Sequence, residues 1–173
     1  LLEAKRLHEP DAPKIDLRVI PSQARLNLGP FDVELINVAH SIPESNALAI
    51  RTPAGMVVHT GDWKIDETPV IPPTTDAARL AALGDEGVLA LVCDSTNAIR
   101  EGRSPSERDV AKSLGEIIAA KKGRVAVTTF ASNVGRIRSI AEAAMENDRS
   151  VVIVGRAMER VCQVARERGL LDG

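Results

Sequence analysis

The stretch Val33–Asp66, VELINVAHSIPESNALAIRTPAGMVVHTGDWKID, decides the fold of the first half of the chain. Polar and apolar residues alternate along Val33–Ala39, which predicts a strand with one buried face. Two further strands are predicted at Ala47–Thr52 and Met56–His59. The Pro-Ala-Gly turn at residues 53–55 joins these two strands, so they are expected to form a hairpin in a unit rich in strands.

Two polar residues, His40 and Asp62, directly follow predicted strands. Imidazole is a good zinc ligand, and a carboxylate at the end of a strand can bridge two metal ions. Each residue taken alone is more often a loop or turn residue that hydrogen-bonds its own backbone. Taken together, the two residues fit a metal site and a pair of ordinary turns equally well. His59 lies inside a strand, where we expect a structural role with its tautomer set by a local hydrogen bond.

The composition is that of an ordinary globular protein with an aliphatic core. The 173 residues are 44% hydrophobic and 27% charged, and aromatic residues make up only 2%. This length allows one domain or two pieces of larger domains. The formal net charge of -2 gives no global signal for nucleic-acid binding, so a site for a polyanion would have to be local. No apolar run is long enough to span a bilayer, and no signal peptide is recognisable.

Cys93 and Cys162 are the two cysteines of the chain, and they lie far apart in apolar runs. We expect both to be reduced core thiols of a cytosolic protein. The sequence contains no C-x-x-C motif, which excludes a zinc site built on such a thiolate pair.

Turn and helix signals surround the central stretch. Leu1–His8 is predicted to be the end of a helix, and Arg25–Pro30 is predicted to be a turn. After a proline-rich loop, a short amphipathic helix is predicted over Asp76–Leu83 and is expected to end at Gly84. Val88–Cys93 is a continuous apolar run, which predicts a strand buried on both faces.

The second half of the chain alternates strictly between helix and strand signals. Ser104-Pro105-Ser106-Glu107 is a capping box with proline at the first helical position, which predicts a helix over Pro105–Lys121. The elements predicted after it are a strand at Val125–Thr129, a helix at Asn133–Asn147, a strand at Val151–Val154 and a helix at Met158–Arg168. This alternation predicts βαβ units and a parallel sheet, with the junction between the two halves near residues 97–102.

Polar residues also follow two of the later predicted strands. Asp94 begins the segment Asp-Ser-Thr-Asn after the apolar run, and open α/β sheets place their sites at such strand ends. Ser132 and Asn133 open a helix whose free N–H groups suit phosphate, and Arg136 is close by. A turn that ends the strand at Asp94 and an ordinary capped helix at Asn133 account for the same residues.

Five motifs in order carry a resemblance to a known family. HSIPES, HTGDWKID, CDSTNA, GRSPSE and FASNVGRI resemble the motifs of ribonuclease J, which belongs to the β-CASP group of the metallo-β-lactamase fold. The resemblance extends from about Leu28 to the end of the chain. It implies an α/β fold: part of a metallo-β-lactamase αββα sandwich followed by the start of a β-CASP doubly wound α/β domain. The first metallo-β-lactamase segment would then contribute its C-terminal portion as residues 1–100, and the β-CASP domain its N-terminal portion as residues 101–173.

The same resemblance implies roles for individual residues. His40 would be a zinc ligand from the third metal motif, and Asp62 would be the carboxylate shared by two zinc ions. Asp94 would be the catalytic acidic residue of the first β-CASP motif, which orients a histidine from another part of the protein and helps to protonate the leaving oxygen. The residues implied to bind the RNA substrate are Ser132, Asn133 and Arg136.

The family's main metal motif, H-x-H-x-D-H, does not occur in this chain. We expect it to lie before Leu1, and we expect the later β-CASP motifs to lie beyond Gly173. The resemblance therefore implies two zinc ions in the complete protein and at most weak or partial zinc binding by this chain, which we expect to be inactive alone.

The function implied is that of a zinc-dependent ribonuclease, an endonuclease and 5′-to-3′ exonuclease that acts in rRNA processing and mRNA decay. Its partners would be single-stranded RNA and further copies of itself, as a homodimer or homotetramer in the cytoplasm without membrane association. Two alternatives stay open. A non-catalytic RNA-binding paralogue is disfavoured by the intact His40 and Asp62, and a phosphodiesterase of the same fold for small substrates would not need the extension after Asn97.

Overall fold

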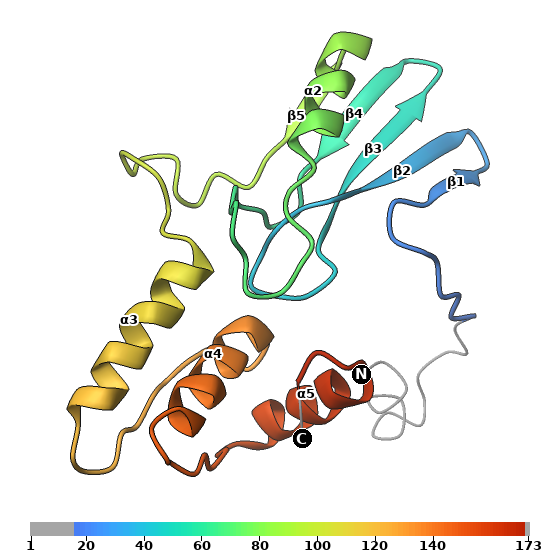
Figure 1. The fold of residues 1–173 in the computed structure, drawn as a ribbon. Helices are drawn as coiled ribbons and strands as arrows, with labels where there is room; N and C mark the ends of the chain where they lie inside the picture. Colours follow the sequence, from blue (N-terminus) through green and yellow to red (C-terminus); the bar gives the residue numbers. More distant parts are fainter. Residues whose placement is uncertain (1–15, 172–173) are drawn as a thin grey trace.

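A computed structural model describes residues 16–171 and shows a mixed α/β arrangement of a five-stranded sheet and several helices (Figure 1). The strands are β1 (Arg25–Leu28), β2 (Phe31–Asn37), β3 (Asn46–Thr52), β4 (Gly55–His59) and β5 (Ala90–Val92). The helices are α2 (Ala77–Glu86), α3 (Glu107–Ala120), α4 (Val134–Met145) and α5 (Arg156–Glu167). The helix end predicted at Leu1–His8 lies outside the described residues.

The strands lie in the order β1-β2-β3-β4-β5, and all neighbours are antiparallel except β4 and β5, which are parallel. The hairpin predicted between β3 and β4 is confirmed: Ala49 lies opposite Val58, and Thr52 pairs with Gly55 next to the turn. Gly55 has a φ of 138°, a conformation that residues with a side chain rarely adopt.

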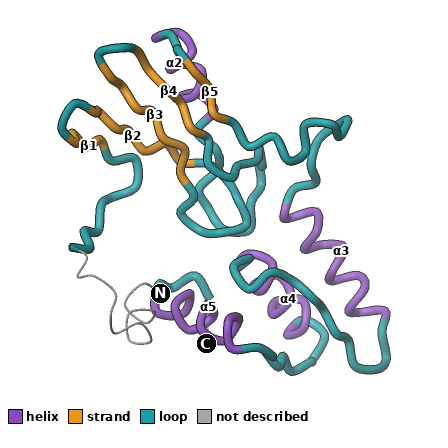
Figure 2. Tube along the Cα trace, turned by 180° about the vertical axis from the view of Figure 1, so that it is seen from behind, coloured by secondary structure: helices purple, strands orange, loops and turns teal. Residues whose placement is uncertain are grey.

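One face of the sheet carries the core of the first half of the chain. Ile36 of β2 and alternate residues of β3 and β4 are buried there, and α2 lies along this face (Figures 1 and 2). The buried residues of this cluster are Ile36, Val38, Ala47, Ala49, Met56, Val58 and Leu83. Leu83 of α2 is 1% exposed. Burial of one such leucine contributes about 2 kcal/mol to keeping the helix on the sheet.

A network of four charged side chains joins α2 to β2 and β3. Glu34 of β2 accepts hydrogen bonds from Arg79 of α2 at 2.5 and 2.9 Å and from Arg51 of β3 at 2.8 Å. Glu86 of α2 accepts from Arg51 at 2.7 Å and pairs with Arg79 at 2.9 Å. The hydrogen bonds from Arg79, supported by those from Arg51, outweigh the opposing effect of burial and lower the pKa of Glu34 to about 2.

We expect Glu34→Gln to weaken the fold at neutral pH and to make it less sensitive to acid. The folded pKa of about 2 lies below the ordinary 4.5, so the stability from ionised Glu34 is complete above about pH 4.5 and is lost as the pH falls towards 2. The substitution should lower the free energy of unfolding by about 2 kcal/mol at neutral pH and by much less near pH 2. Urea unfolding at both pH values measures this, and equal losses would contradict it.

Helices α3, α4 and α5 lie beyond the end of the sheet at which β2 and β4 finish (Figures 1 and 2). Helices α3 and α4 pack against each other, and α5 contacts α4. The buried apolar residues of these helices are Ile118, Val134, Ile137, Ala143, Ala144, Cys162 and Ala165. The three helices follow the sheet along the chain in the predicted order. Because they pack on one another, they form a separate helical layer.

One turn prediction and one strand prediction need correction at the two outer strands of the sheet. Arg25–Leu28 is strand β1, which pairs with β2 through a turn at Gly29; only the last part of the predicted turn Arg25–Pro30 is a turn. The strand predicted over Val88–Cys93 spans only Ala90–Val92, and it is exposed because it lies at the edge of the sheet formed by residues 16–171. Strand pairing depends on a distant neighbour, so a short local pattern does not reveal it.

The predicted end of α2 at Gly84 is also wrong. The helix continues to Glu86, and Gly87 follows it with a φ of 94°. A glycine inside a helix costs about 1 kcal/mol relative to alanine. The burial of the adjacent Leu83 against the sheet offsets this cost and carries the helix past Gly84.

The capping box of α3 lies two residues later than predicted. The N-cap is Ser106 and not Ser104, and the helix begins at Glu107. The Ser106 hydroxyl accepts from the Arg108 N–H at 3.2 Å, and the Asp109 carboxylate accepts from the Ser106 N–H at 3.3 Å. Both serines fit the sequence signature, and the pairing with Asp109 selects the second.

The parallel strands predicted at Val125–Thr129 and Val151–Val154 are wrong for the described part of the chain. Neither segment is hydrogen-bonded as a strand within residues 16–171. Apolar side chains of both segments are exposed, with Val152 at 82% and Val154 at 83%. A β-ladder needs a neighbouring strand for its N–H and C=O groups, and strand-like composition alone does not supply one.

The prediction of two core thiols holds for one cysteine. Cys162 is buried in α5, and burial raises the pKa of its thiol. Cys93 is exposed, because it follows the edge strand β5. Among residues 16–171, no helix combines the length and apolarity that crossing a bilayer requires.

Candidate functional site

The C-terminal ends of strands β2, β4 and β5 lie on the same side of the sheet. β2 and β4 are both antiparallel to β3, so they run in the same direction, and β5 is parallel to β4. His40 follows β2, Asp62 follows β4 and Asp94 follows β5. The topology therefore places three predicted site residues after the C-terminal ends of these strands, where α/β sheets commonly carry their sites.

A backbone pair and two side-chain hydroxyls hold the loops after β2 and β4 together. Ala39 and Lys64 form an isolated antiparallel bridge, in which the Lys64 N–H donates to the Ala39 carbonyl at 2.9 Å. The Thr75 hydroxyl accepts from the Ala39 N–H at 2.8 Å and donates to the Lys64 carbonyl at 2.7 Å. Ser45 is 8% exposed, and its hydroxyl donates to the Asp62 carbonyl at 3.2 Å.

Thr60 links the loop after β4 to the loop after β5. It is buried, and its backbone N–H donates to the Val92 carbonyl at 2.9 Å. Its hydroxyl accepts from the Asp94 N–H at 3.0 Å. The Asp94 carboxylate in turn accepts from the Thr96 N–H at 2.9 Å and from the Thr96 hydroxyl at 2.6 Å. The backbone of Asp94 and its side chain are therefore both fixed.

The surroundings of Asp94 favour its ionised form. Hydrogen bonds from the side chain and backbone of Thr96 lower the pKa of Asp94 most, against the opposing effect of burial. His40 and the backbone N–H of Trp63 lower the pKa of Asp94 further. A carboxyl group with a lowered pKa accepts hydrogen bonds at neutral pH and is a poor proton donor.

His40 is partly buried, whereas Asp62 is exposed. The Ser41 hydroxyl lies 3.4 Å from Nδ1 of His40. Asp62 follows Gly61, whose φ of 59° turns the chain sharply after β4. Nδ1 of His59 accepts from the Gly61 N–H at 3.0 Å, which confirms the local hydrogen bond predicted to set the tautomer of His59.

The side chains of His40 and Asp62 suit zinc, but they are too few to hold it among the described residues. Imidazole and carboxylate are zinc ligands, and zinc sites in proteins use three or four protein ligands. Residues 16–171 contain no group of three or more His, Cys, Asp and Glu side chains placed to hold a metal ion. His40 and Asp62 can therefore supply only part of a zinc site.

We expect Gly61→Ala to cost more stability than Gly29→Ala. Both glycines have a positive φ, 59° and 61°, so a side chain costs about 1 kcal/mol at either position. A Cβ at Gly61 would also lie 3.1 Å from the Asn46 carbonyl oxygen, whereas a Cβ at Gly29 would meet nothing within 4 Å. The additional loss at Gly61 should be about 1 kcal/mol. Urea unfolding of both variants tests this, and equal losses would show that the contact with Asn46 relaxes freely.

The three residues predicted to bind RNA lie together at the N-terminus of α4, and two of them have partners inside the protein. Asn133 is 8% exposed and caps α4 by accepting from the Arg136 N–H at 2.9 Å. The Arg136 guanidinium pairs with Glu107 of α3 at 2.5 Å. Ser132 is exposed and precedes the cap.

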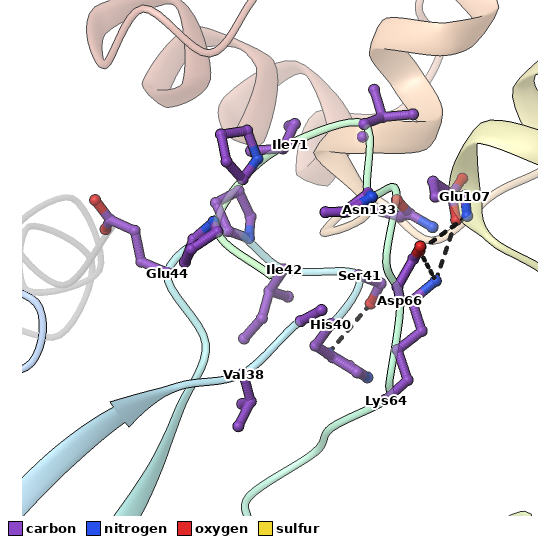
Figure 3. Close-up of a pocket in the computed structure, with 17 residues that line it drawn as sticks. Val38, His40, Ser41, Ile42, Glu44, Lys64, Asp66, Ile71, Glu107 and Asn133 are labelled. Carbon is purple, nitrogen blue, oxygen red and sulfur yellow. Dashed lines mark hydrogen bonds and ion pairs between the residues drawn. The ribbon is translucent and has the colours of Figure 1, made fainter. Parts of the chain in front are cut away.

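Lys64 and Asp66 lie next to His40, although the motifs do not single them out. They line a narrow pocket between the loops after β2 and β4 and the N-termini of α3 and α4 (Figure 3). His40 and Glu107 line the same pocket, whose volume of about 20 Å³ holds little more than one water molecule. The regular spacing of Lys64 and Asp66 after Asp62 in HTGDWKID is the signal that could have indicated them.

Comparison with known proteins identifies the family. The family model described as "Ribonuclease J, beta-CASP domain" matches residues 122–173. Ribonuclease J of Sinorhizobium meliloti is 57% identical over 173 residues, which cover 100% of this chain and 31% of that protein. The chain belongs to the ribonuclease J family.

Two further ribonuclease J proteins support this assignment. Those of Thermus thermophilus and Corynebacterium glutamicum are each 43% identical, over 90% and 99% of this chain. The aligned residues span 27% and 24% of these two relatives, so the chain corresponds to less than a third of a ribonuclease J.

The solved structure of a protein of unknown function from Enterococcus faecalis V583 has a similar fold. It matches with a TM-score of 0.55 and 20% identity, over 75% of this chain and 31% of that chain. At this identity the similarity concerns the fold alone. The segment thus has a mixed α/β fold with a five-stranded sheet, and its residues 122–173 match the β-CASP domain of ribonuclease J, as the motifs predict.

Proposed function

We propose that the full-length polypeptide containing this segment is a zinc-dependent ribonuclease that hydrolyses phosphodiester bonds in single-stranded RNA. The observation that supports the proposal is the common direction of β2, β4 and β5, the strands that precede His40, Asp62 and Asp94, in a chain 57% identical to a ribonuclease J. The proposal includes internal cleavage and 5′-to-3′ exonucleolysis, in rRNA processing and mRNA decay.

His40 and Asp62 are the residues of this segment that would hold zinc. Asp62 would be shared by two ions, and the other ligands would come from elsewhere in the polypeptide. Bound zinc would supply a water molecule of lowered pKa and positive charge beside the phosphate. The bonds from Ser45 and Thr75 support this role, because they fix the backbone of the loops that carry the two ligands.

Asp94 would act as an ionised hydrogen-bond acceptor. Its lowered pKa, caused chiefly by Thr96, makes it unsuited to donate a proton itself at neutral pH. We propose that it orients a histidine from another part of the polypeptide, and that this histidine carries the proton to the leaving oxygen.

The N-terminus of α4 would contribute to RNA binding. Ser132 is exposed there and would contact a phosphate, with support from the partial positive charge of the helix end. Asn133 and Arg136 would shape the helix end, since both already have partners within the protein.

We also propose the larger organisation that the family resemblance implies. Residues 1–100 would belong to the metallo-β-lactamase unit and residues 101–173 to the β-CASP unit. The full-length polypeptide would act in the cytoplasm as a homodimer or homotetramer.

The zinc assignment predicts the metal content of the full-length polypeptide. We expect about two zinc ions per chain, and we expect Asp62→Asn to lose at least one of them together with RNA cleavage. Metal analysis by inductively coupled plasma mass spectrometry measures this. Asp85→Asn, an exposed carboxylate on α2, is the matched control and should leave the zinc content unchanged. An Asp62→Asn protein with full zinc content would show that the assignment of Asp62 is wrong.

The RNA assignment predicts a preference for ribose. We expect the full-length polypeptide to degrade 5′-monophosphorylated single-stranded RNA faster than a DNA strand of the same sequence, because the 2′-hydroxyl distinguishes the two. Gel assays with end-labelled strands of both kinds measure the rates and also separate internal from terminal cleavage. Equal rates on the two strands would argue against RNA as the substrate.

A further inference from the structure

The N-terminus of α3 is held by a carboxylate from the first half of the chain. Asp66, whose side chain is fully buried, accepts from the Glu107 N–H at 2.9 Å and from the Lys64 ammonium at 2.9 Å (Figure 3). It also accepts from the Thr68 N–H at 3.0 Å. Burial would raise the pKa of Asp66, but these bonds outweigh it and lower the pKa to about 2.

The contact continues from α3 to α4. The Glu107 carboxylate accepts from the Arg136 guanidinium at 2.5 and 3.2 Å and lies 4.0 Å from the Lys64 ammonium. The Ser106 hydroxyl adds a bond of 2.8 Å to the Thr68 carbonyl. The loop that follows Asp62 is therefore bound through charged groups to the start of both helices.

Asp66 is not needed to cap α3, because the helix has its own cap. The capping box of Ser106 and Asp109 satisfies the N–H groups of Arg108 and Ser106. Asp66 binds a different group, the N–H of Glu107, from a position 41 residues earlier in the chain. Its bonds thus serve to dock the helical layer against the loop that carries Asp62.

We propose that Asp66 is a positioning residue that fixes the α3–α4 layer beside the His40 and Asp62 loops and thereby sets how tightly RNA is held. The inference rests on the proposed function, and it adds a residue that touches neither zinc nor RNA. If the layer is displaced, the N-terminus of α4 no longer lies at a fixed distance from the loops that would hold zinc. RNA binding should therefore suffer, while the metal site and the chemical step stay intact.

The test compares Asp66→Ala and Asp66→Asn in the full-length polypeptide. Loss of a buried hydrogen-bonded carboxylate should raise the KM for single-stranded RNA about tenfold in Asp66→Ala, with kcat and zinc content changed less than about twofold. Asp66→Asn keeps one acceptor oxygen and should give a smaller rise in KM. It also serves as the test if Asp66→Ala does not fold.

Glu34→Gln is the matched control, because it removes another ion-paired carboxylate, partly buried and also with a pKa of about 2, away from the α3–α4 joint. It should lose stability without a change in KM. Hydrogen exchange of the same full-length variants gives a second readout. In both Asp66 variants the Glu107 amide should exchange faster, while the Arg108 amide, bound by Ser106, should keep its protection.

The possible failures are distinguishable. An unsubstituted polypeptide that does not cleave RNA would overturn the proposed function, and this inference with it. Normal cleavage by the unsubstituted protein together with an unchanged KM in both Asp66 variants would overturn the inference alone. A fall in kcat or zinc content at constant KM would also overturn it, because Asp66 would then act on the metal site.

Discussion

The candidate site depends on the common direction of β2, β4 and β5. Two antiparallel pairings through β3 give β2 and β4 the same direction, and the parallel β4–β5 pair extends it to a third strand. The register is equally important, because a slip of one residue would turn Ala49 and Val58 away from the core. The burial of Leu83 and the ion pairs of Glu34 hold that register from the side of α2.

Beyond the strands, the site is held by a few short polar side chains. Loop N–H and carbonyl groups that turn away from water need partners, and regular structure does not supply them there. Ser45, Thr60 and Thr75 fill this need, and each joins segments that are distant in sequence. Such side chains are small enough to be buried between the loops, and their bonds are directional. They make irregular segments into a defined support for His40, Asp62 and Asp94.

Local patterns predict local structure well here, and distant contacts account for the errors. Alternation and a three-residue turn correctly predict the β3–β4 hairpin, and capping signals place α4 to within a few residues. The predicted strands at Val125–Thr129 and Val151–Val154 failed because strand formation requires a neighbour, which local composition does not reveal. The motifs indicate His40 and Asp62 by type and position. The bond from Asp66 to Glu107 spans 41 residues, and no periodicity could predict it.

The joint between the two layers contains a chain of charged groups. Lys64, Asp66, Glu107 and Arg136 alternate in sign from the Asp62 loop to the first turn of α4. Buried ion pairs contribute little net stability, because desolvation cancels most of their attraction. They do impose geometry, since each hydrogen bond is satisfied in a narrow range of positions, whereas apolar surfaces can slide past one another. A joint of this kind can hold the α3–α4 helices at a fixed distance from the loop that carries Asp62.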